Sequence, residues 1–240
     1  MRLLHDGAGV SVELAGGELL PLRHIIGVGR NYAEHARERG AEVPDRPMLF
    51  TKSFASAILD GEAIRIPQVC VDPATGGEQV DYEAELAVII GRPCRDATEA
   101  TALEHVLGYC CANDVSARWW QKSGAGGQFF RGKSFDTFCP LGPQVTPAAE
   151  VADPQDLAIR CRVNGEVMQE DSTASMMFPV PALIAEISCG ATLPAGTVIL
   201  TGTPGGVGAV RTPPRFLREG DVVEVEIDGL GTLRNPVVAA

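Results

Sequence analysis

The sequence predicts an α+β protein that is predominantly β, with few short helices. Short apolar or alternating runs, each bounded by Gly, Pro or Asp, dominate the chain, and this is typical of strands separated by turns. Only three stretches suggest helices. The composition, 45% hydrophobic over 240 residues, allows a large core. We expect a short N-terminal β appendage, residues 1–22, and one main domain, residues 23–240.

Seven runs are predicted to be strands because they are apolar or alternate with period two. They are Ser11–Leu14, His24–Val28, Ala63–Pro67, Val80–Ile90, Ala158–Val163, Thr197–Thr201 and Val222–Ile227. Asn164-Gly165 is a strong signal for a two-residue hairpin turn between alternating segments. Asp60-Gly61 and Asp228-Gly229 are similar turn signals between strand-like runs.

Three helices are predicted. The clearest covers Ala97–Leu107, where Asp96 and Glu99 fit a capping box. A second covers about Pro181–Ser188, with prolines at its entry. A third, short helix covers Tyr32–Arg39, and its thin apolar face means that docking has to stabilise it.

Charge, targeting signals and cysteines limit the possible functions. The formal net charge of −11, with no Lys/Arg cluster to offset it, argues against nucleic acid or an anionic membrane as a partner. We find neither a signal-peptide pattern nor a long uninterrupted apolar run, so we expect a cytosolic protein. Seven cysteines without CxxC spacing suit free buried thiols better than disulfides or zinc.

The stretch VDYEAELAVIIG places three carboxylates at every second position of a predicted strand. Asp81, Glu83 and Glu85 therefore share one face. Apolar residues on both faces further along predict burial, where unpaired carboxylates are costly and require a compensating charge. The alternative is that Glu83 and Glu85 face solvent on an edge strand, since Glu is rarely buried.

A further carboxylate follows the next apolar run, in GYCCANDVSARWWQ. Asp114 lies at the predicted end of that strand. Hard divalent cations prefer oxygen ligands, and Mg²⁺ usually keeps several waters while taking few protein carboxylates. Glu83, Glu85 and Asp114 would form such an open site without any His or Cys.

Six motifs in this order resemble those of the fumarylacetoacetate hydrolase family. They are GVGRNYAEHA, VDYEAELAVIIG, GYCCANDVSAR, RGKSFDTFCPLGP, TGTPGGVG and GDVVEVEIDGLGTLRNPV, and the match extends from about Gly27 to Pro236. The resemblance implies a mixed β-roll fold, a homodimer, a catalytic role for the main domain, and Mg²⁺ or Mn²⁺ bound through Glu83, Glu85 and Asp114.

The resemblance also assigns catalytic residues. His35 and Glu38 are three apart and would share a helical face, where the carboxylate can orient an imidazole that deprotonates water. Without the motif, His35 would be read as a solvated surface histidine. Lys133 is placed beside the metal and the developing enolate, whose charge it would help to neutralise.

Substrate binding is assigned through the same motifs. The positions implied are Arg30, Arg118, Gln121 and Thr203. The guanidinium groups of the two arginines suit a substrate carboxylate, and the amide of Gln121 can hydrogen-bond to an oxo group. Arg118 and Gln121 could instead be structural partners of Asp114. TGTPGGVG lacks the Gly-Lys-Ser/Thr of a P-loop, and TKSF either brings Lys52 and Ser53 to the pocket or is a plain strand end.

The leading functional hypothesis is a metal-dependent hydrolase that cleaves a C–C bond in an acylpyruvate- or fumarylpyruvate-like diketo acid through a stabilised enolate. The alternative on the same site is an isomerase or tautomerase of an unsaturated 2-oxo dicarboxylate, similar to 5-carboxymethyl-2-hydroxymuconate isomerase, or an oxaloacetate decarboxylase. In either case the partner is a small 2-oxo or diketo acid. A nonenzymatic, metal-stabilised binding scaffold is the third hypothesis, and it leaves Lys133 without a role.

Overall fold

The computed structural model describes residues 1–34 and 45–240. The molecule is built mainly of strands with few short helices, which confirms the predicted class. Ala33 and Glu34 begin a helical turn, and the rest of the helix predicted over Tyr32–Arg39 lies outside the described residues.

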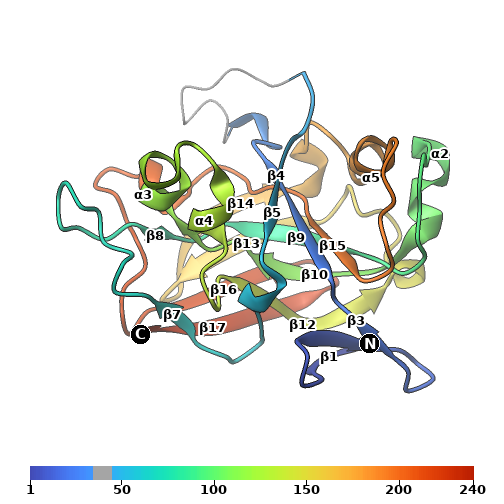
Figure 1. Cartoon of the computed structure of the whole chain (residues 1–240), viewed down its shortest axis with the longest axis horizontal. Coiled ribbons are helices and arrows are strands. Elements are labelled where there is room, and N and C mark those ends of the chain that lie inside the picture. Colours follow the sequence, from blue (N-terminus) through green and yellow to red (C-terminus); the bar gives the residue numbers. More distant parts are fainter. Residues whose placement is uncertain (35–44) are drawn as a thin grey trace.

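Seven strands form the largest sheet, in the order β5-β4-β15-β9-β10-β12-β6 (Figure 1). Their bounds are β4 (His24–Gly29), β5 (Met48–Lys52), β6 (Ala57–Leu59), β9 (Ala84–Ile90), β10 (Val106–Asn113), β12 (Cys139–Pro147) and β15 (Thr197–Leu200). β4 is parallel to β15 and β6 to β12, while the other neighbours are antiparallel. β9 therefore lies in the middle of a mixed sheet.

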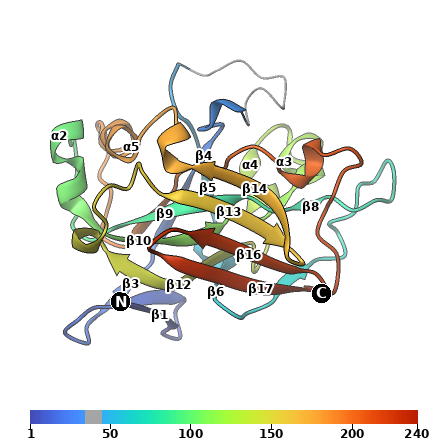
Figure 2. The same cartoon turned by 180° about the vertical axis from the view of Figure 1, so that it is seen from behind.

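A second sheet has the order β14-β13-β16-β17-β7, and Figure 2 shows it in front of β9 and β10. Its strands are β7 (Ile64–Ile66), β13 (Ala158–Val163), β14 (Glu166–Ser172), β16 (Val222–Ile227) and β17 (Gly231–Ala239). The hairpin predicted at Asn164-Gly165 joins β13 to β14, and both turn residues have positive φ, which confirms it. The short strands β8 (Val80–Asp81) and β11 (Ser116–Ala117) pair with each other.

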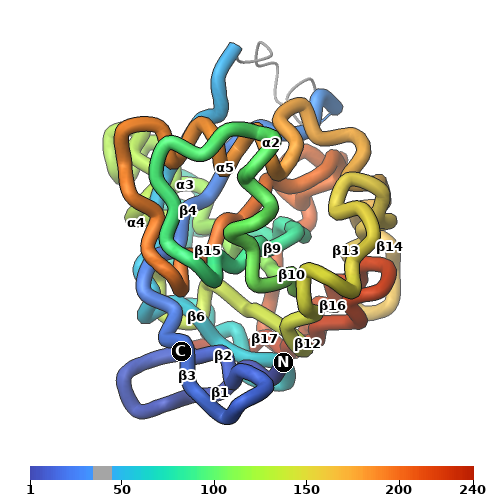
Figure 3. The backbone as a smooth tube through the Cα atoms, turned by 90° about the vertical axis from the view of Figure 1, so that its right-hand side faces the viewer, coloured from blue at the N-terminus to red at the C-terminus, as the bar shows by residue number. Residues whose placement is uncertain are grey.

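The N-terminal residues form a separate three-stranded antiparallel sheet. Its strands are β1 (Arg2–His5), β2 (Val10–Glu13) and β3 (Leu19–Pro21). Figure 3 shows this sheet at one end of the molecule, next to β12. Leu3 and Val12 join an apolar cluster with Ile25 and Ile89 of the large sheet. The division of the chain at residue 22 into two domains stays a prediction.

β9 is buried on both faces, which explains its continuous apolar sequence. Ala84, Leu86, Val88 and Ile90 belong to the main core, shared with the second sheet and α5. Ala87 and Ile89, on the other face, belong to the cluster under the N-terminal sheet. Because residues two apart point the same way, Glu85 lies on the face of Ala87 and Ile89, just before the apolar cluster begins.

Beyond Glu34, the described residues contain four short α-helices and six 3₁₀ turns. The α-helices are α2 (Glu99–Ala102), α3 (Arg118–Gln121), α4 (Phe129–Lys133) and α5 (Val180–Ser188). The 3₁₀ turns are η1 (Phe54–Ser56), η2 (Leu103–His105), η3 (Ser123–Ala125), η4 (Ala148–Glu150), η5 (Thr173–Ser175) and η6 (Gly208–Val210). α5 confirms the second predicted helix.

The helix predicted over Ala97–Leu107 is wrong at its C-terminal end. The α-helix covers Glu99–Ala102 and a 3₁₀ turn covers Leu103–His105, but β10 begins at Val106, which pairs with Ile90 of β9. Sheet pairing overrides the apolar helical spacing there, because Val106 gains a strand partner in the core. The helix cap is also different: Thr98 and Thr101 form the capping box in place of the predicted Asp96 and Glu99.

The cysteines are free thiols, as predicted, and all but one are buried. Six of the seven cysteines are free and buried, whereas Cys189 is free and exposed at the end of α5. Within residues 1–34 and 45–240, no helix has the length and apolar character needed to cross a membrane.

Candidate metal centre and active site

The predicted strand over Val80–Ile90 is interrupted at the point where the carboxylates converge. β8 ends at Asp81 and β9 begins at Ala84, because side chains take over the backbone hydrogen bonds between them. The N–H of Glu83 donates to Asn113 Oδ1 at 3.0 Å, and the N–H of Asp114 donates to the carbonyl of Glu83 at 2.9 Å. These two bonds place the end of β10 directly beside Glu83.

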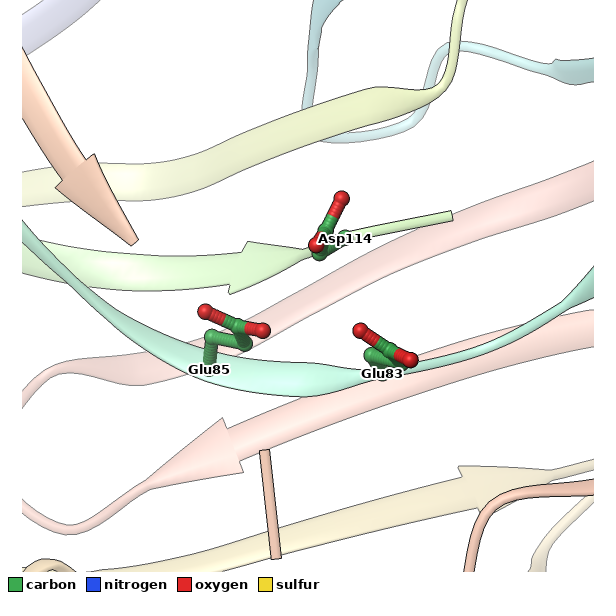
Figure 4. A group of neighbouring side chains, drawn as sticks. All are labelled: Glu83, Glu85 and Asp114. Atoms are coloured by element: carbon green, nitrogen blue, oxygen red, sulfur yellow. The ribbon is translucent and has the colours of Figure 1, made fainter. Parts of the chain in front are cut away.

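Glu83, Glu85 and Asp114 form one buried carboxylate cluster, which we call the carboxylate triad. One oxygen from each lies within 4.8 Å of the others, and all three residues are at least 95% buried. Figure 4 shows Glu85 on β9, Glu83 on the segment that leads into it, and Asp114 just after the end of β10. The alternative of two solvent-facing glutamates on an edge strand is therefore wrong, since β9 is central and covered on both faces.

Two buried lysines approach the triad from different elements. Lys133, at the end of α4, donates to Glu83 Oε2 at 2.6 Å and to Asp114 Oδ2 at 2.5 Å. Lys52, at the end of β5, donates to Asp114 Oδ1 at 2.5 Å. Burial by itself would lower the pKa of Lys133, but Asp114 and Glu83 raise it above its ordinary value. Lys133 therefore stays charged at neutral pH.

Arg118 connects the triad to a fourth carboxylate. Its Nε donates to Asp81 Oδ2 at 2.8 Å, and its Nη1 donates to Glu83 Oε1 at 2.6 Å and to Gln121 Oε1 at 3.1 Å. Burial opposes the charge of Arg118, but Asp81 and Glu83 raise its pKa above the ordinary value. Asp81 also accepts hydrogen bonds from the N–H groups of the η6 segment, so it anchors the loop that follows Thr203.

Glu85 has the least compensation within the triad. In the described residues, only the N–H of Gly202 donates to its carboxylate, at 2.7 Å. Burial raises the pKa of Glu85 well above its ordinary value, and Asp114 and Glu83 raise it further. Three crowded, buried oxygen donors of this kind fit a hard divalent cation, because its charge would remove both the repulsion and the cost of burial.

A cavity of about 270 Å³ opens beside the triad. Its polar wall contains Glu83, Glu85, Gln121, Lys133 and Thr203. The remaining lining includes an apolar group formed by Val28, Met48, Phe50 and Phe129, together with Gly29, Arg30 and Lys122. The Phe50 and Phe129 rings are 5.6 Å apart, and Lys133 Nζ lies 5.0 Å from the Phe50 centroid. A small molecule in this cavity would therefore contact carboxylates, cations and an apolar wall together.

Comparison with known proteins identifies the family. The family model described as the fumarylacetoacetate (FAA) hydrolase C-terminal domain matches residues 24–238. The chain belongs to the fumarylacetoacetate hydrolase family. This confirms the resemblance carried by the six motifs. The fold expectation is confirmed as well, because fumarylacetoacetate hydrolase-type structures share the mixed β architecture.

Several members of the fumarylacetoacetate hydrolase family are closely similar. Oxaloacetate tautomerase fahd2, mitochondrial, of Xenopus laevis is 48% identical over 214 residues, which are 89% of this chain but 65% of that relative. The chain thus spans just under two thirds of the frog protein. Oxaloacetate tautomerase YisK of Bacillus subtilis (strain 168) is 43% identical over 219 residues, 90% of this chain and 70% of YisK.

A solved structure of similar size is also close. The 5-carboxymethyl-2-hydroxymuconate delta-isomerase from Mycobacterium smegmatis is 36% identical, with a TM-score of 0.80. The match covers 100% of this chain and 93% of that one. The fold of this fumarylacetoacetate hydrolase family member is therefore similar to that isomerase structure over nearly the whole of both chains.

The predicted site residues differ in how close they lie to the cavity of this family member. The cavity is lined by two triad residues and by four of the predicted residues, Arg30, Gln121, Lys133 and Thr203. Arg118 is not among the lining residues, and its guanidinium donates hydrogen bonds to Asp81 and Glu83. Neither Arg118 nor Gln121 hydrogen-bonds to Asp114, the structural partner that the sequence suggested. His35 and Glu38 lie outside the described residues, so their catalytic assignment stays a prediction.

Other residues of the site carried little or no sequence signal. Lys52 ends β5 in a motif that is equally compatible with a plain strand end, and its contact with Asp114 depends on the packing of β5. The segment after Gln121 contains η3 and α4, and α4 carries Phe129 and Lys133 into the cavity wall. These helices are too short for apolar periodicity to reveal them.

Gly132 allows α4 to pack closely on α3, and substituting it should move Lys133. A Cβ at Gly132 would lie 2.4 Å from the backbone N of Gln121 and 2.8 Å from the carbonyl of Ala117. We expect Gly132→Ala to destabilise the fold by about 1–3 kcal/mol through overpacking and to lower turnover by more than about tenfold through misplacement of Lys133. Thermal melts and turnover assays test this.

The matched control for this substitution is Gly16→Ala. A Cβ there meets nothing within 4 Å, and Gly16 is outside the positive-φ region. It should leave both stability and turnover near wild-type values. Equal effects of the two substitutions would contradict the proposed packing role of Gly132.

Proposed function

We propose that this chain is a divalent-metal-dependent tautomerase of a small 2-oxo dicarboxylic acid, with oxaloacetate as the first candidate substrate. The observation that carries the proposal is the buried carboxylate triad with Lys133 at the wall of a small cavity. Its similarity to two oxaloacetate tautomerases, at 48% and 43% identity, supports the choice of reaction. The isomerase structure supports the same enolate chemistry.

The charge balance of the site favours an anionic substrate. With all groups ionised, the carboxylate triad and Asp81 face three cationic side chains, Lys52, Lys133 and Arg118. The cluster formed by these described residues then has one net negative charge. A bound divalent cation would change this to one net positive charge, which would attract a substrate carboxylate into the cavity.

Glu83, Glu85 and Asp114 are the residues that would hold the cation, which we propose to be Mg²⁺ or Mn²⁺. When bound, it would polarise the 2-oxo group and stabilise the enolate. Lys133 reaches the cavity with its ammonium group and can donate a hydrogen bond to a developing enolate oxygen. Gln121 and Thr203 add polar groups to the same wall, and Arg30 adds a cation near the substrate.

Tautomerisation requires a base that removes a proton from the carbon next to the 2-oxo group. We propose His35 with Glu38 as this base. The hydrolytic hypothesis uses the same pair to activate water, and it stays a prediction, as do the homodimer and the cytosolic location. The apolar wall formed by Met48, Phe50 and Phe129 would limit the access of water to the enolate, which favours proton return over hydrolysis.

The test is to follow oxaloacetate by ¹H NMR and by the ultraviolet absorbance of its enol. With Mg²⁺ we expect the protein to accelerate keto–enol interconversion by at least about 10²-fold over Mg²⁺ alone, the scale of general acid–base catalysis. Excess EDTA should remove the acceleration. Accumulation of pyruvate at a rate matching substrate loss would overturn the proposal in favour of decarboxylation.

A second substrate distinguishes hydrolysis. An acylpyruvate incubated under the same conditions should show no protein-dependent release of pyruvate and free acid. Cleavage of the acylpyruvate without tautomerisation of oxaloacetate would establish the C–C hydrolase hypothesis in place of the tautomerase.

A further inference from the structure

Gln169 is a buried side chain that connects two walls of the site. It lies on β14 and is 1% exposed. Its Oε1 accepts a hydrogen bond from the N–H of Ala84 at 2.9 Å. Its Nε2 donates to Thr203 Oγ1 at 2.7 Å and to the carbonyl of Pro204 at 2.9 Å. Gln169 thus joins the start of β9 to the loop that follows β15.

The orientation of the Gln169 amide is fixed by partners that have only one polarity. A backbone N–H can only donate, so the atom facing Ala84 must be the amide oxygen. A carbonyl can only accept, so the atom facing Pro204 must be the amide nitrogen. The usual ambiguity between the two amide orientations is therefore absent at this position.

This orientation determines the polarity of the Thr203 hydroxyl. Because one N–H of Gln169 is directed at Thr203 Oγ1, the hydroxyl oxygen accepts there and its own proton must be donated elsewhere. Within residues 1–34 and 45–240, Thr203 Oγ1 has no hydrogen-bond acceptor for that proton. Thr203 is 3% exposed and lines the cavity, so its proton is available to a molecule bound there.

We propose that Gln169 is a positioning residue that presents the Thr203 hydroxyl as a hydrogen-bond donor to a negatively charged oxygen of the bound 2-oxo acid. This inference rests on the proposed function. Carboxylate and enolate oxygens only accept hydrogen bonds, whereas a substrate hydroxyl can also donate. A Thr203 hydroxyl that is fixed as a donor therefore favours an anionic oxygen over a substrate hydroxyl, whereas a freely rotating hydroxyl would bind both groups.

The test measures the binding of oxalate to the Mg²⁺-loaded protein by calorimetry, because oxalate is a planar dianion with only acceptor oxygens. Thr203→Val should weaken binding by about ten- to a hundredfold, as expected for loss of a hydrogen bond to a charged group. Gln169→Met should weaken it by several-fold. Thr203→Ser, which keeps the hydroxyl, should stay within about threefold of wild type.

The double variant Thr203→Val, Gln169→Met decides between positioning and independent roles. If Gln169 acts through the Thr203 hydroxyl, the double variant should bind oxalate as Thr203→Val does, within about twofold. If the two losses multiply, Gln169 acts independently and the proposal is overturned. The melting temperature and the Mg²⁺ affinity are measured on the same samples. If Gln169→Met only damaged the structure, it would change these two properties, and its effect on oxalate affinity would still add to that of Thr203→Val.

A second substitution keeps the test available if Gln169→Met does not fold. Gln169→Glu has the same shape, but places an oxygen that accepts the Thr203 proton. Its effect on oxalate affinity should likewise vanish in the Thr203→Val background, and a persistent effect there overturns the proposal. Oxalate binding requires no turnover. If the protein does not tautomerise oxaloacetate but the effects of the two substitutions on oxalate affinity are not additive, only the proposed function is rejected. If the protein does tautomerise oxaloacetate but the two effects are additive, only the role of Gln169 is rejected.

Discussion

Glu85→Gln should abolish turnover and at the same time stabilise the metal-free protein at neutral pH. The amide oxygen of Gln can still accept the N–H of Gly202, so the fold keeps its contact while the triad loses a negative charge. We expect turnover to fall by more than about a hundredfold, since loss of an outer partner of a metal ligand already costs 10–100-fold. We expect the metal-free variant to be more stable by about 1–3 kcal/mol, the cost of a poorly compensated buried group.

The pKa of Glu85 determines how the stability of the metal-free protein changes with pH. Burial, Asp114 and Glu83 raise the folded-state pKa of Glu85 well above the ordinary value of 4.5. Stability from this group is therefore fully present below about pH 4.5 and is lost as pH rises through the folded pKa. Metal-free wild type should lose stability relative to Glu85→Gln as pH increases over that interval.

Thermal melts in EDTA and in Mg²⁺, across pH 5 to 8, measure both effects. Mg²⁺ should raise the melting temperature of wild type but not of Glu85→Gln. The control is Glu170→Gln, which removes a carboxylate with a side-chain exposure of 59% and should change neither property. A variant that melts below metal-free wild type at every pH, or equal stabilisation of both proteins by Mg²⁺, would contradict the assignment of Glu85 as a ligand.

Lys133→Met should reduce turnover by about 10²–10³-fold even when the metal is saturating, the loss seen when one donor to a developing oxyanion is removed. Lys133 lies at the cavity wall and contacts two triad carboxylates. Its raised pKa means that the stability it contributes is fully present at neutral pH and is lost only as pH rises through that value. The variant should therefore also be destabilised, by about 3–5 kcal/mol when metal-free, as for a broken buried ion pair.

Lys52→Met is the matched comparison, because both lysines donate to Asp114 but only Lys133 lines the cavity. Both substitutions should destabilise the metal-free protein and increase its Mg²⁺ affinity, since each removes a positive charge next to the ligands. At saturating Mg²⁺, the turnover of Lys52→Met should fall by about tenfold at most. Steady-state assays with Mg²⁺ titrations measure this. Equal losses of turnover in the two variants would show that the charge of Lys133 has only a structural role.

The sequence by itself determined the β-rich class, the positions of the strands with the clearest apolar or alternating pattern, and the composition of the triad. Strands such as β13 and β16 follow from period-two alternation, and the Asn164-Gly165 hairpin from its backbone preferences. Glu83 and Glu85 had to share one side of a strand, whatever the rest of the fold. These properties are local, because they depend on the direction of neighbouring side chains and on turn geometry.

Only the tertiary structure decided which charges meet at the site. Val106 lies in β10 and not in the predicted helix, because strand pairing in the core outweighs the local helical spacing of apolar residues. Lys52 and Gln169 come from strands of two different sheets, and their contacts with Asp114 and Thr203 connect residues 62 and 34 positions apart. Long-range contacts of this kind leave no periodic trace in the sequence, since they depend on how the sheets stack around the triad.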